Sequence, residues 1–354
     1  MFGSKNTKKH DSAGEVILMG HGGGGTLTRD LIGDIIARGL SNPALDGLDD
    51  AACVSLPPGE TAVSTDSYVV YPLFFPGGDI GRLAVSGTVN DLTMQGARPL
   101  YLSLGLILEE GLPLNHLRGI VDSLAATARE CGVSVITGDT KVVERRIPAG
   151  DGRKTGGMFI NTTGIGARID GIDTSAGNAG PGDAVIVTGT LGDHGISVLN
   201  ARNELGLDTG VESDVAPLWS VFEPLFDSSL EIHCLRDPTR GGAAAALCDI
   251  ARASSCCVRL KESSLPVREE VRGACDILGL EPLSVANEGK AVVVCPEGDA
   301  EQVISLLKKH PLSREARVIG TVEPEPAGRV LMDTAAGGER IVNMPAGESL
   351  PRIC

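Results

Sequence analysis

Aromatic and basic side chains are both scarce in this sequence. Phe, Trp and Tyr make up 3% of the 354 residues, so the core must be packed mainly by Val, Leu, Ile and Ala, from an apolar fraction of 42%. The 31 Lys and Arg residues are outnumbered by 46 Asp and Glu, which gives a net charge of −15. Nucleic acids and anionic membrane surfaces attract basic surface, so the charge argues against both as partners.

Paired-cysteine motifs are missing as well. The nine cysteines include no Cys-x-x-Cys pair and no zinc-ligand spacing, and the adjacent Cys256 and Cys257 cannot easily bridge each other. Four further cysteines sit in apolar runs and read as small core residues: Cys53, Cys131, Cys248 and Cys295. This usage is typical of a reducing compartment and predicts a cytoplasmic protein.

Long apolar runs are absent near the start of the sequence. The run Val16-Ile17-Leu18-Met19 is too short for a signal-peptide core or a membrane span. We expect no membrane segment there, and we expect residues 1–14 to be disordered.

Short apolar runs typical of strands are interspersed with segments of helical spacing. The expected strands are 52–56, 62–65, 100–108, 133–137, 159–165, 184–188, 258–261, 291–295 and 317–322. The expected helices are 81–95, 114–131, 195–205, 238–253, 268–278 and 300–309. Because strands of the first half come in adjacent pairs, the pattern predicts an α+β fold with mixed sheets rather than a regular doubly wound sheet.

The length of the chain favours two domains. A cluster of Gly, Asn and Pro at 177–182 marks a turn or linker, and we place the domain boundary near 168–182. The predicted units are a first domain at 15–168, a second at 169–333 and a flexible tail at 334–354. The tail is expected because its Gly and Pro residues disfavour both helix and sheet.

A glycine-rich loop is the first candidate binding element. Residues 20–26 read Gly-His-Gly-Gly-Gly-Gly-Thr, and a helix is expected to follow near Thr28. The backbone N–H groups of Gly22, Gly23, Gly24 and Gly25 can converge on a phosphate, to which the helix dipole adds. No Gly-Lys-Ser/Thr follows, so this is not a Walker A loop, and a flexible linker is the alternative interpretation.

Acidic residues recur near the ends of the expected strands and helices. They are Asp49-Asp50, Asp66, Asn90-Asp91 and Asp139, the last followed by Lys141. Carboxylates without neighbouring His or Cys suit hard cations such as Mg²⁺ bound to phosphate. Any one of these residues is explained equally well as a turn or cap residue, but the set favours a metal–nucleotide site.

Two motifs of the second half carry further candidates. Asp237-Pro238 is expected to begin a helix as N-cap and first residue, and Arg240 before two glycines suits phosphate. Glu288 precedes an apolar strand and is either a general base or a turn residue. The lone His194 is more typical of a structural residue than of a catalytic one.

The sequence ends in Pro-Arg-Ile-Cys, and this terminal thiol of Cys354 is its most informative feature. Chain ends are usually exposed, and an exposed thiol is nucleophilic and prone to oxidation. An accidental terminal cysteine is the alternative. The Gly- and Pro-containing residues before it predict a thiol on a flexible arm.

These motifs together resemble the HypE family of hydrogenase maturation proteins, the carbamoyl dehydratases of an ATP-binding superfamily. That superfamily also contains aminoimidazole ribonucleotide synthetase, selenophosphate synthetase and thiamine-phosphate kinase. The resemblance runs from about Ile17 to Cys354, and its acidic motifs are common to the superfamily whereas the Pro-Arg-Ile-Cys end is specific to HypE. The matching stretches are 20–25, 65–70, 76–78, 88–91, 108–113, 137–143, 189–195, 237–242, 287–290 and 351–354.

The resemblance implies a reaction and its residues. A carbamoyl group on the Cys354 thiol would be dehydrated to a thiocyanate with ATP, which supplies the cyanide ligand of nickel–iron hydrogenase. It implies two α/β domains like those of aminoimidazole ribonucleotide synthetase, with Mg²⁺ and ATP as cofactors. The implied Mg²⁺–ATP ligands are Asp50, Asp66, Asp91 and Asp237. The implied nucleotide contacts are Gly22 to Gly25, Asn90, Asp139 and Arg240. Lys141 would stabilise the phosphoryl group or the imidate, and Glu288 would be the base.

The implied partners are a second copy in a homodimer, the carbamoyltransferase HypF and the HypC–HypD iron scaffold. Two alternatives stay open. A selenophosphate synthetase would carry a reactive Cys near the glycine loop, and residues 20–26 contain none. A non-catalytic thiol carrier would not need the acidic set.

Overall fold

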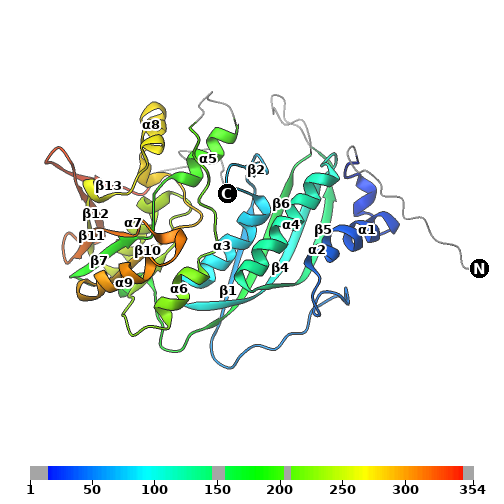
Figure 1. Ribbon diagram of the computed structural model, residues 1–354, viewed down its shortest axis with the longest axis horizontal. Helices are drawn as coiled ribbons and strands as arrows, with labels where there is room; N and C mark the ends of the chain where they lie inside the picture. Colours follow the sequence, from blue (N-terminus) through cyan, green and yellow to red (C-terminus); the bar gives the residue numbers. More distant parts are fainter. Residues whose placement is uncertain (1–14, 146–155, 203–208, 346–354) are drawn as a thin grey trace, which may run out of the picture.

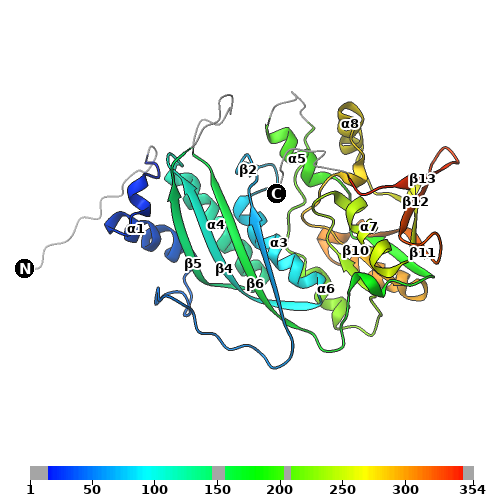
Figure 2. The ribbon, with the colours of Figure 1, turned by 180° about the vertical axis from the view of Figure 1, so that it is seen from behind.

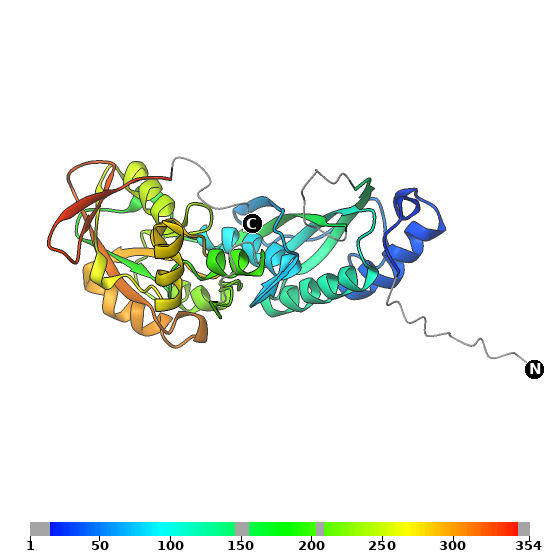
Figure 3. The same cartoon turned by 90° about the horizontal axis from the view of Figure 1, so that it is seen from above.

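The computed structural model describes residues 15–145, 156–202 and 209–345. Within these ranges the chain forms two α/β units that lie side by side along the long axis of the molecule (Figure 1 and Figure 3). Strand β6 ends the first unit at Arg168, and strand β7 opens the second at Asp183. Residues 169–182 form the connection between the two units.

The first unit is built on a four-stranded mixed sheet. Its order is β1-β6-β4-β5, in which only the β4–β5 pair is parallel and α4 is the crossover between them. The elements are α1 (Thr26–Leu31), α2 (Arg38–Leu40), β1 (Thr61–Tyr68), β2 (Phe74–Phe75), β3 (Gly78–Asp79), α3 (Ile80–Met94), β4 (Ala97–Glu109), α4 (Leu114–Cys131), β5 (Ser134–Val143) and β6 (Met158–Arg168).

Helices α3 and α4 cover one face of this sheet, as Figure 1 shows. Helix α4 buries Leu117, Ile120, Val121 and Leu124, which recur at three- and four-residue intervals, and Gly132 ends it in the left-handed conformation. No helix of the described chain covers the opposite face (Figure 2). That face presents exposed side chains such as Val63, which has a relative exposure of 66%.

The second unit contains a seven-stranded mixed sheet of order β13-β12-β9-β11-β7-β10-β8, antiparallel except for the β12–β9 pair. The two mixed sheets confirm the expected α+β class. The elements are β7 (Asp183–Val187), α5 (Asp193–Arg202), α6 (Trp219–Phe226), β8 (Cys234–Arg236), α7 (Gly242–Ser254), β9 (Cys257–Lys261), α8 (Glu269–Leu278), β10 (Val292–Pro296), α9 (Ala300–Leu307), β11 (Arg317–Glu323), β12 (Arg329–Asp333) and β13 (Glu339–Val342).

The hydrophobic core is continuous across the junction of the two units. One cluster of buried side chains contains Leu83 of α3 together with Phe222 of α6 and Val303 of α9, while a second lies between α7 and the seven-stranded sheet. Polar contacts reinforce the junction: Arg82 Nε donates to the Val215 carbonyl at 2.9 Å, and the Arg98 guanidinium lies over the Trp219 ring. The functional residues near this junction are therefore held by a packed interface.

Three sequence-based expectations need correction. Residues 52–56 form no strand, because they lie in an exposed connection without a partner strand. Helix α7 begins at Gly242 rather than at Pro238, since Gly241 adopts a φ of +73° and breaks the helix there. The segment expected to be a tail from residue 334 contains β13. This strand pairs antiparallel with β12, from Glu339 opposite Asp333 to Val342 opposite Val330.

We find no helix in the described ranges with the length and apolar content needed to cross a bilayer.

Candidate functional site

Three of the predicted acidic residues gather where the two units meet. Asp66 on β1 faces the helices, Asp91 lies on α3, and Asp237 lies in the segment before α7. The Ser64 hydroxyl donates to Asp91 Oδ2 at 2.5 Å, and Arg240 Nη2 lies 2.9 Å from Asp66 Oδ1. The strand, the helix and the loop thus bring carboxylates from distant parts of the sequence to one place.

The pKa values of this group show how closely its charges interact. Burial, and then the neighbouring Asp91, raise the pKa of Asp237 to about 7. The pKa of Asp91 is raised by burial, an effect that the Ser64 hydrogen bond opposes. Burial, followed by Asp237, also raises the pKa of Glu288 well above its usual range. Such an arrangement of negative groups favours binding of a cation.

The donor chemistry of the cluster fits Mg²⁺, although the protein does not build a complete cage. In the described ranges, no three Asp, Glu, His or Cys side chains are grouped so as to hold a metal ion by themselves. Mg²⁺ is usually bound by one or two carboxylates together with substrate phosphates and water. Asp66, Asp91 and Asp237 supply such hard oxygen ligands, and Arg240 beside them suits the phosphates.

Glu288 lies in a turn that is held on both sides. Asp214 accepts hydrogen bonds from the N–H groups of Glu288 and Gly289, at 3.1 and 3.3 Å, and its carboxylate lies 3.4 Å from the buried Lys290 Nζ. Asn90 contacts the same turn, because its amide donates to the Glu288 carbonyl at 3.3 Å. The sequence motifs indicated Glu288 but gave no signal for Asp214, which lies outside every recognised motif.

Asp139 and Lys141 lie on β5, the other edge strand of the first sheet, and Gly22 packs against that strand. Gly22 packs against β5 so closely that a Cβ there would come within 2.9 Å of Val142 Cβ. Asp139 and Lys141 form an exposed ion pair with a shortest distance of 2.6 Å, which lowers the pKa of Asp139. Asp50 is exposed in the connection before β1.

The strand register places the Asp139–Lys141 pair and the acidic cluster on opposite faces of the sheet. Asp139 is paired with Gly105, Gly105 with Asn161, and Asn161 with Ser67, so Asp139 shares a face with Ser67. Asp66, the neighbour of Ser67, points to the opposite, helix-covered face. A single chain therefore does not bring Lys141 to the acidic cluster.

The thiol of Cys354 lies outside the described residues, as do the other residues of 346–354. The last described residue, Pro345, lies beside Gly241, the residue that follows Arg240: a Cβ built on Gly241 would be 3.5 Å from Pro345 Cγ. Nine further residues span at most about 32 Å when fully extended. The other eight cysteines are free thiols, of which Cys53 is exposed.

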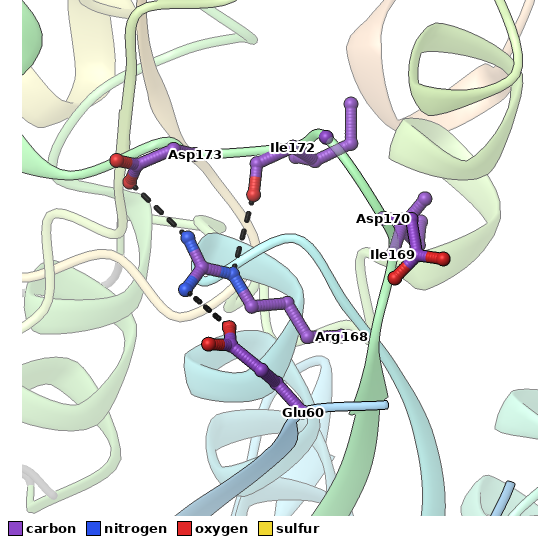
Figure 4. Close-up of a pocket in the computed structure, with 7 residues that line it drawn as sticks. Glu60, Arg168, Ile169, Asp170, Ile172 and Asp173 are labelled. Atoms are coloured by element: carbon purple, nitrogen blue, oxygen red, sulfur yellow. Dashed lines mark hydrogen bonds and ion pairs between the residues drawn. The ribbon is translucent and has the colours of Figure 1, made fainter. Parts of the chain in front are cut away.

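A pocket of about 330 Å³ lies next to the connection between the units (Figure 4). Arg168 occupies its centre and is bound by Glu60, Asp173 and the carbonyl of Ile172. Glu60 precedes β1, six residues before Asp66, which corresponds to about 20 Å along an extended strand. This pocket is therefore separate from the acidic cluster.

Comparisons with known proteins match this architecture. Residues 48–167 match the family model of the AIR synthase related protein N-terminal domain, and residues 180–333 match the model of its C-terminal domain. The carbamoyl dehydratase HypE of Azotobacter vinelandii is 49% identical over 338 residues, which cover 96% of this chain and 97% of the relative.

Solved structures show the same relationship. The crystal structure of hydrogenase maturation protein HypE in complex with ATP is 47% identical, with a TM-score of 0.88, and the match covers 95% of this chain and 99% of that one. HypE in the crystal structure of a HypE–HypF complex is 44% identical, with a TM-score of 0.76, over 91% of this chain and 100% of that one. The chain therefore belongs to the HypE family of carbamoyl dehydratases, which has the two domains of the AIR synthase-related proteins.

Proposed function

We propose that this protein uses ATP to dehydrate the S-carboxamide carried by its own Cys354 to a thiocyanate, the cyanide source for nickel–iron hydrogenase. The observation that carries the proposal is the position of Pro345 beside Gly241, because the adjacent Arg240 forms an ion pair with Asp66 of the acidic cluster. A chain that leaves this point can present its thiol to the cluster at high effective concentration.

The carboxamide oxygen attacks the γ-phosphoryl group of ATP, which releases ADP and makes that oxygen part of a phosphate leaving group. Loss of the nitrogen protons then expels phosphate, and the carbon–nitrogen triple bond forms. Water is thus removed in the form of phosphate, and the balance of the reaction is thiocyanate, ADP and phosphate.

Each group of residues has a role in these steps. We propose that Asp50, Asp66, Asp91 and Asp237 hold Mg²⁺–ATP, with Mg²⁺ neutralising charge on the phosphates when bound. Arg240 and the backbone of Gly22 to Gly25 bind phosphate, and Asp139 belongs to the nucleotide site. The nucleotide contact predicted for Asn90 from the sequence is not part of this proposal, because its side chain is engaged with Leu218, Ala216 and Glu288.

Glu288 is the proposed base that removes the nitrogen proton. Its burial raises its pKa, so that it accepts a proton more readily near neutral pH than an ordinary carboxylate. Lys141 is proposed to stabilise the phosphoryl group or the imidate as negative charge develops.

A homodimer is the arrangement that brings both sets of residues together. Lys141 and Asp139 lie on the face of the sheet that no described helix covers, and the acidic cluster lies on the other side. Pairing two such faces also buries Val63 and Ile107, which are 66% and 42% exposed in the single chain. Because β5 and β1 are the two edge strands of the sheet, we propose that β5 of one copy lies over β1 of the second copy, so that Lys141 reaches round this edge to the acidic cluster of the second copy.

The partners follow from the chemistry. HypF is proposed to load the carbamoyl group on Cys354, and the HypC–HypD complex to receive the cyanide on iron. We propose the cytoplasm as the site of action, because the free thiols of the described residues fit a reducing compartment.

ATP hydrolysis before and after carbamoylation tests this function. We expect the carbamoylated protein to hydrolyse ATP in a single turnover that matches the amount of loaded Cys354. Cys354→Ser removes this turnover, whereas Cys53→Ser, which removes the exposed thiol of the first unit, retains it. Equal ATP turnover in the Cys354→Ser variant would contradict the proposal.

A further inference from the structure

Asn90 precedes Asp91 on α3, but its side chain points into the junction between the two units. Its side-chain oxygen accepts a hydrogen bond from the Leu218 N–H at 2.8 Å. Its amide nitrogen donates to the carbonyls of Ala216 and Glu288, at 3.1 and 3.3 Å. The residue is 2% exposed, and both amide hydrogens are used in these contacts.

The Glu288 turn therefore has its carbonyl held by Asn90 and its N–H held by Asp214. Asp214 belongs to the same segment, 214–218, whose backbone Asn90 also binds. Gly289 lets the turn pack directly against this segment, because a Cβ there would lie 1.8 Å from the Asp214 carbonyl oxygen. Of these contacts, the Asn90 hydrogen bond is the one that ties the Glu288 turn directly to α3.

We propose that Asn90 is a positioning residue that fixes Glu288 relative to Asp91 during dehydration, and that it does not bind the nucleotide. One rigid helix carries Asp91, proposed to hold the nucleotide, and Asn90, which holds the base. Reacting groups displaced by about 1 Å can lose about 100-fold in rate, so this contact matters for catalysis. The inference rests on the proposed role of Glu288 as base.

The first test compares binding with turnover in Asn90→Ala. We expect the Kd for a non-hydrolysable ATP analogue to change less than about threefold, while single-turnover dehydration of carbamoylated protein slows about 30- to 100-fold. The matched control is Thr174→Val, because the buried Thr174 hydroxyl donates to the Met94 carbonyl at the end of the same helix. Thr174→Val removes a comparable contact of α3 and is expected to retain full turnover.

A double-mutant cycle with Glu288→Gln separates positioning from a general structural role. If Asn90 acts through Glu288, Asn90→Ala slows the residual reaction of Glu288→Gln by less than about threefold. If the rate losses of the two single variants multiply in the double variant, that result would overturn the inference. So would a Kd for the analogue that rises more than about tenfold in Asn90→Ala with the rate of the saturated enzyme unchanged, because Asn90 would then be a nucleotide ligand.

Asp214→Asn serves as the second variant if Asn90→Ala fails to fold. It weakens the other hold on the same turn, and we expect the same pattern of retained binding and slowed turnover; an unchanged rate would overturn the inference. Full activity of Glu288→Gln would instead refute the proposed base, and the inference with it. If Glu288→Gln loses activity but the rate losses of Asn90→Ala and Glu288→Gln multiply in the double variant, only the role of Asn90 is refuted.

Discussion

Arg240 and Asp66 form an ion pair across the two units, with Nη2 of Arg240 2.9 Å from Oδ1 of Asp66. The Arg240 side chain is 69% exposed, so this pair contributes little to folding, about 0–1 kcal/mol. An exposed guanidinium beside carboxylates and next to Gly241 is well placed to meet a phosphate anion. We therefore propose that the pair serves ATP binding rather than stability.

We predict that Arg240→Ala weakens ATP binding about tenfold or more, since a hydrogen bond to a charged group is worth about 1.5–3 kcal/mol. The free energy of unfolding should change by less than about 1 kcal/mol. Calorimetric titration and chemical denaturation measure the two quantities. Arg98→Ala is the control, because Arg98 also forms an exposed ion pair across the units, with Glu223. Equal ATP affinity in wild type and Arg240→Ala would contradict the assignment.

Asp193 provides a prediction for pH dependence. Burial raises its pKa, and its Oδ1 atom is buried without a hydrogen-bond partner in the described structure. The folded state therefore binds a proton more tightly than the unfolded state, whose Asp pKa is about 3.9. This contribution to stability is present at low pH and is lost as the pH rises from about 4 through the raised pKa.

Asp193→Asn removes the buried charge and keeps the shape of the side chain. We expect the variant to gain about 1–3 kcal/mol in the free energy of unfolding relative to wild type at pH 8, and much less at pH 4. Urea unfolding at both pH values measures this difference. A variant that is less stable than wild type at pH 8 would show that the ion pair with Arg268, at 3.5 Å, outweighs the cost of burial.

Helices and strands whose form is determined by their own residues could be predicted from local sequence patterns. Helix α4 was predicted with the bounds that it has, because its apolar spacing is regular and Gly132 ends it. Helix α6 was missed, since Pro224 lies inside it. Strand β13 was missed because the glycines before it indicated a coil, while its pairing with β12 decides the structure.

The site was predictable as a set of motifs but not as an arrangement. Asp66, Asp91 and Asp237 were selected by their motifs. Burial, and then the charge of the neighbouring Asp91, raises the pKa of Asp237, and Asp66 adds to this effect. The opposite orientation of Lys141 depends on the register of three strand pairs, which no local pattern encodes. The contact of Asn90 with Glu288, 198 positions away, likewise depends on the packing of the two units.

Complementation between two inactive variants tests the shared site. We predict that Lys141→Met and Asp91→Asn are each inactive as homodimers. A randomly mixed population should recover about one quarter of wild-type turnover, because half of the dimers are mixed and each has one intact site. Single-turnover dehydration after co-expression or subunit exchange measures the recovery. No recovery in purified mixed dimers would place Lys141 and Asp91 of one chain in the same site.

The central claim is that Cys354 carries the group that is dehydrated, and intact-mass analysis of the C-terminal peptide tests it most directly. The protein is loaded with the carbamoyl group and then incubated with ATP and Mg²⁺, and the peptide is measured before and after. Our account predicts that the carbamoylated peptide loses the mass of one water only when ATP is present. A carbamoylated peptide that keeps its mass while ATP is consumed would contradict the account.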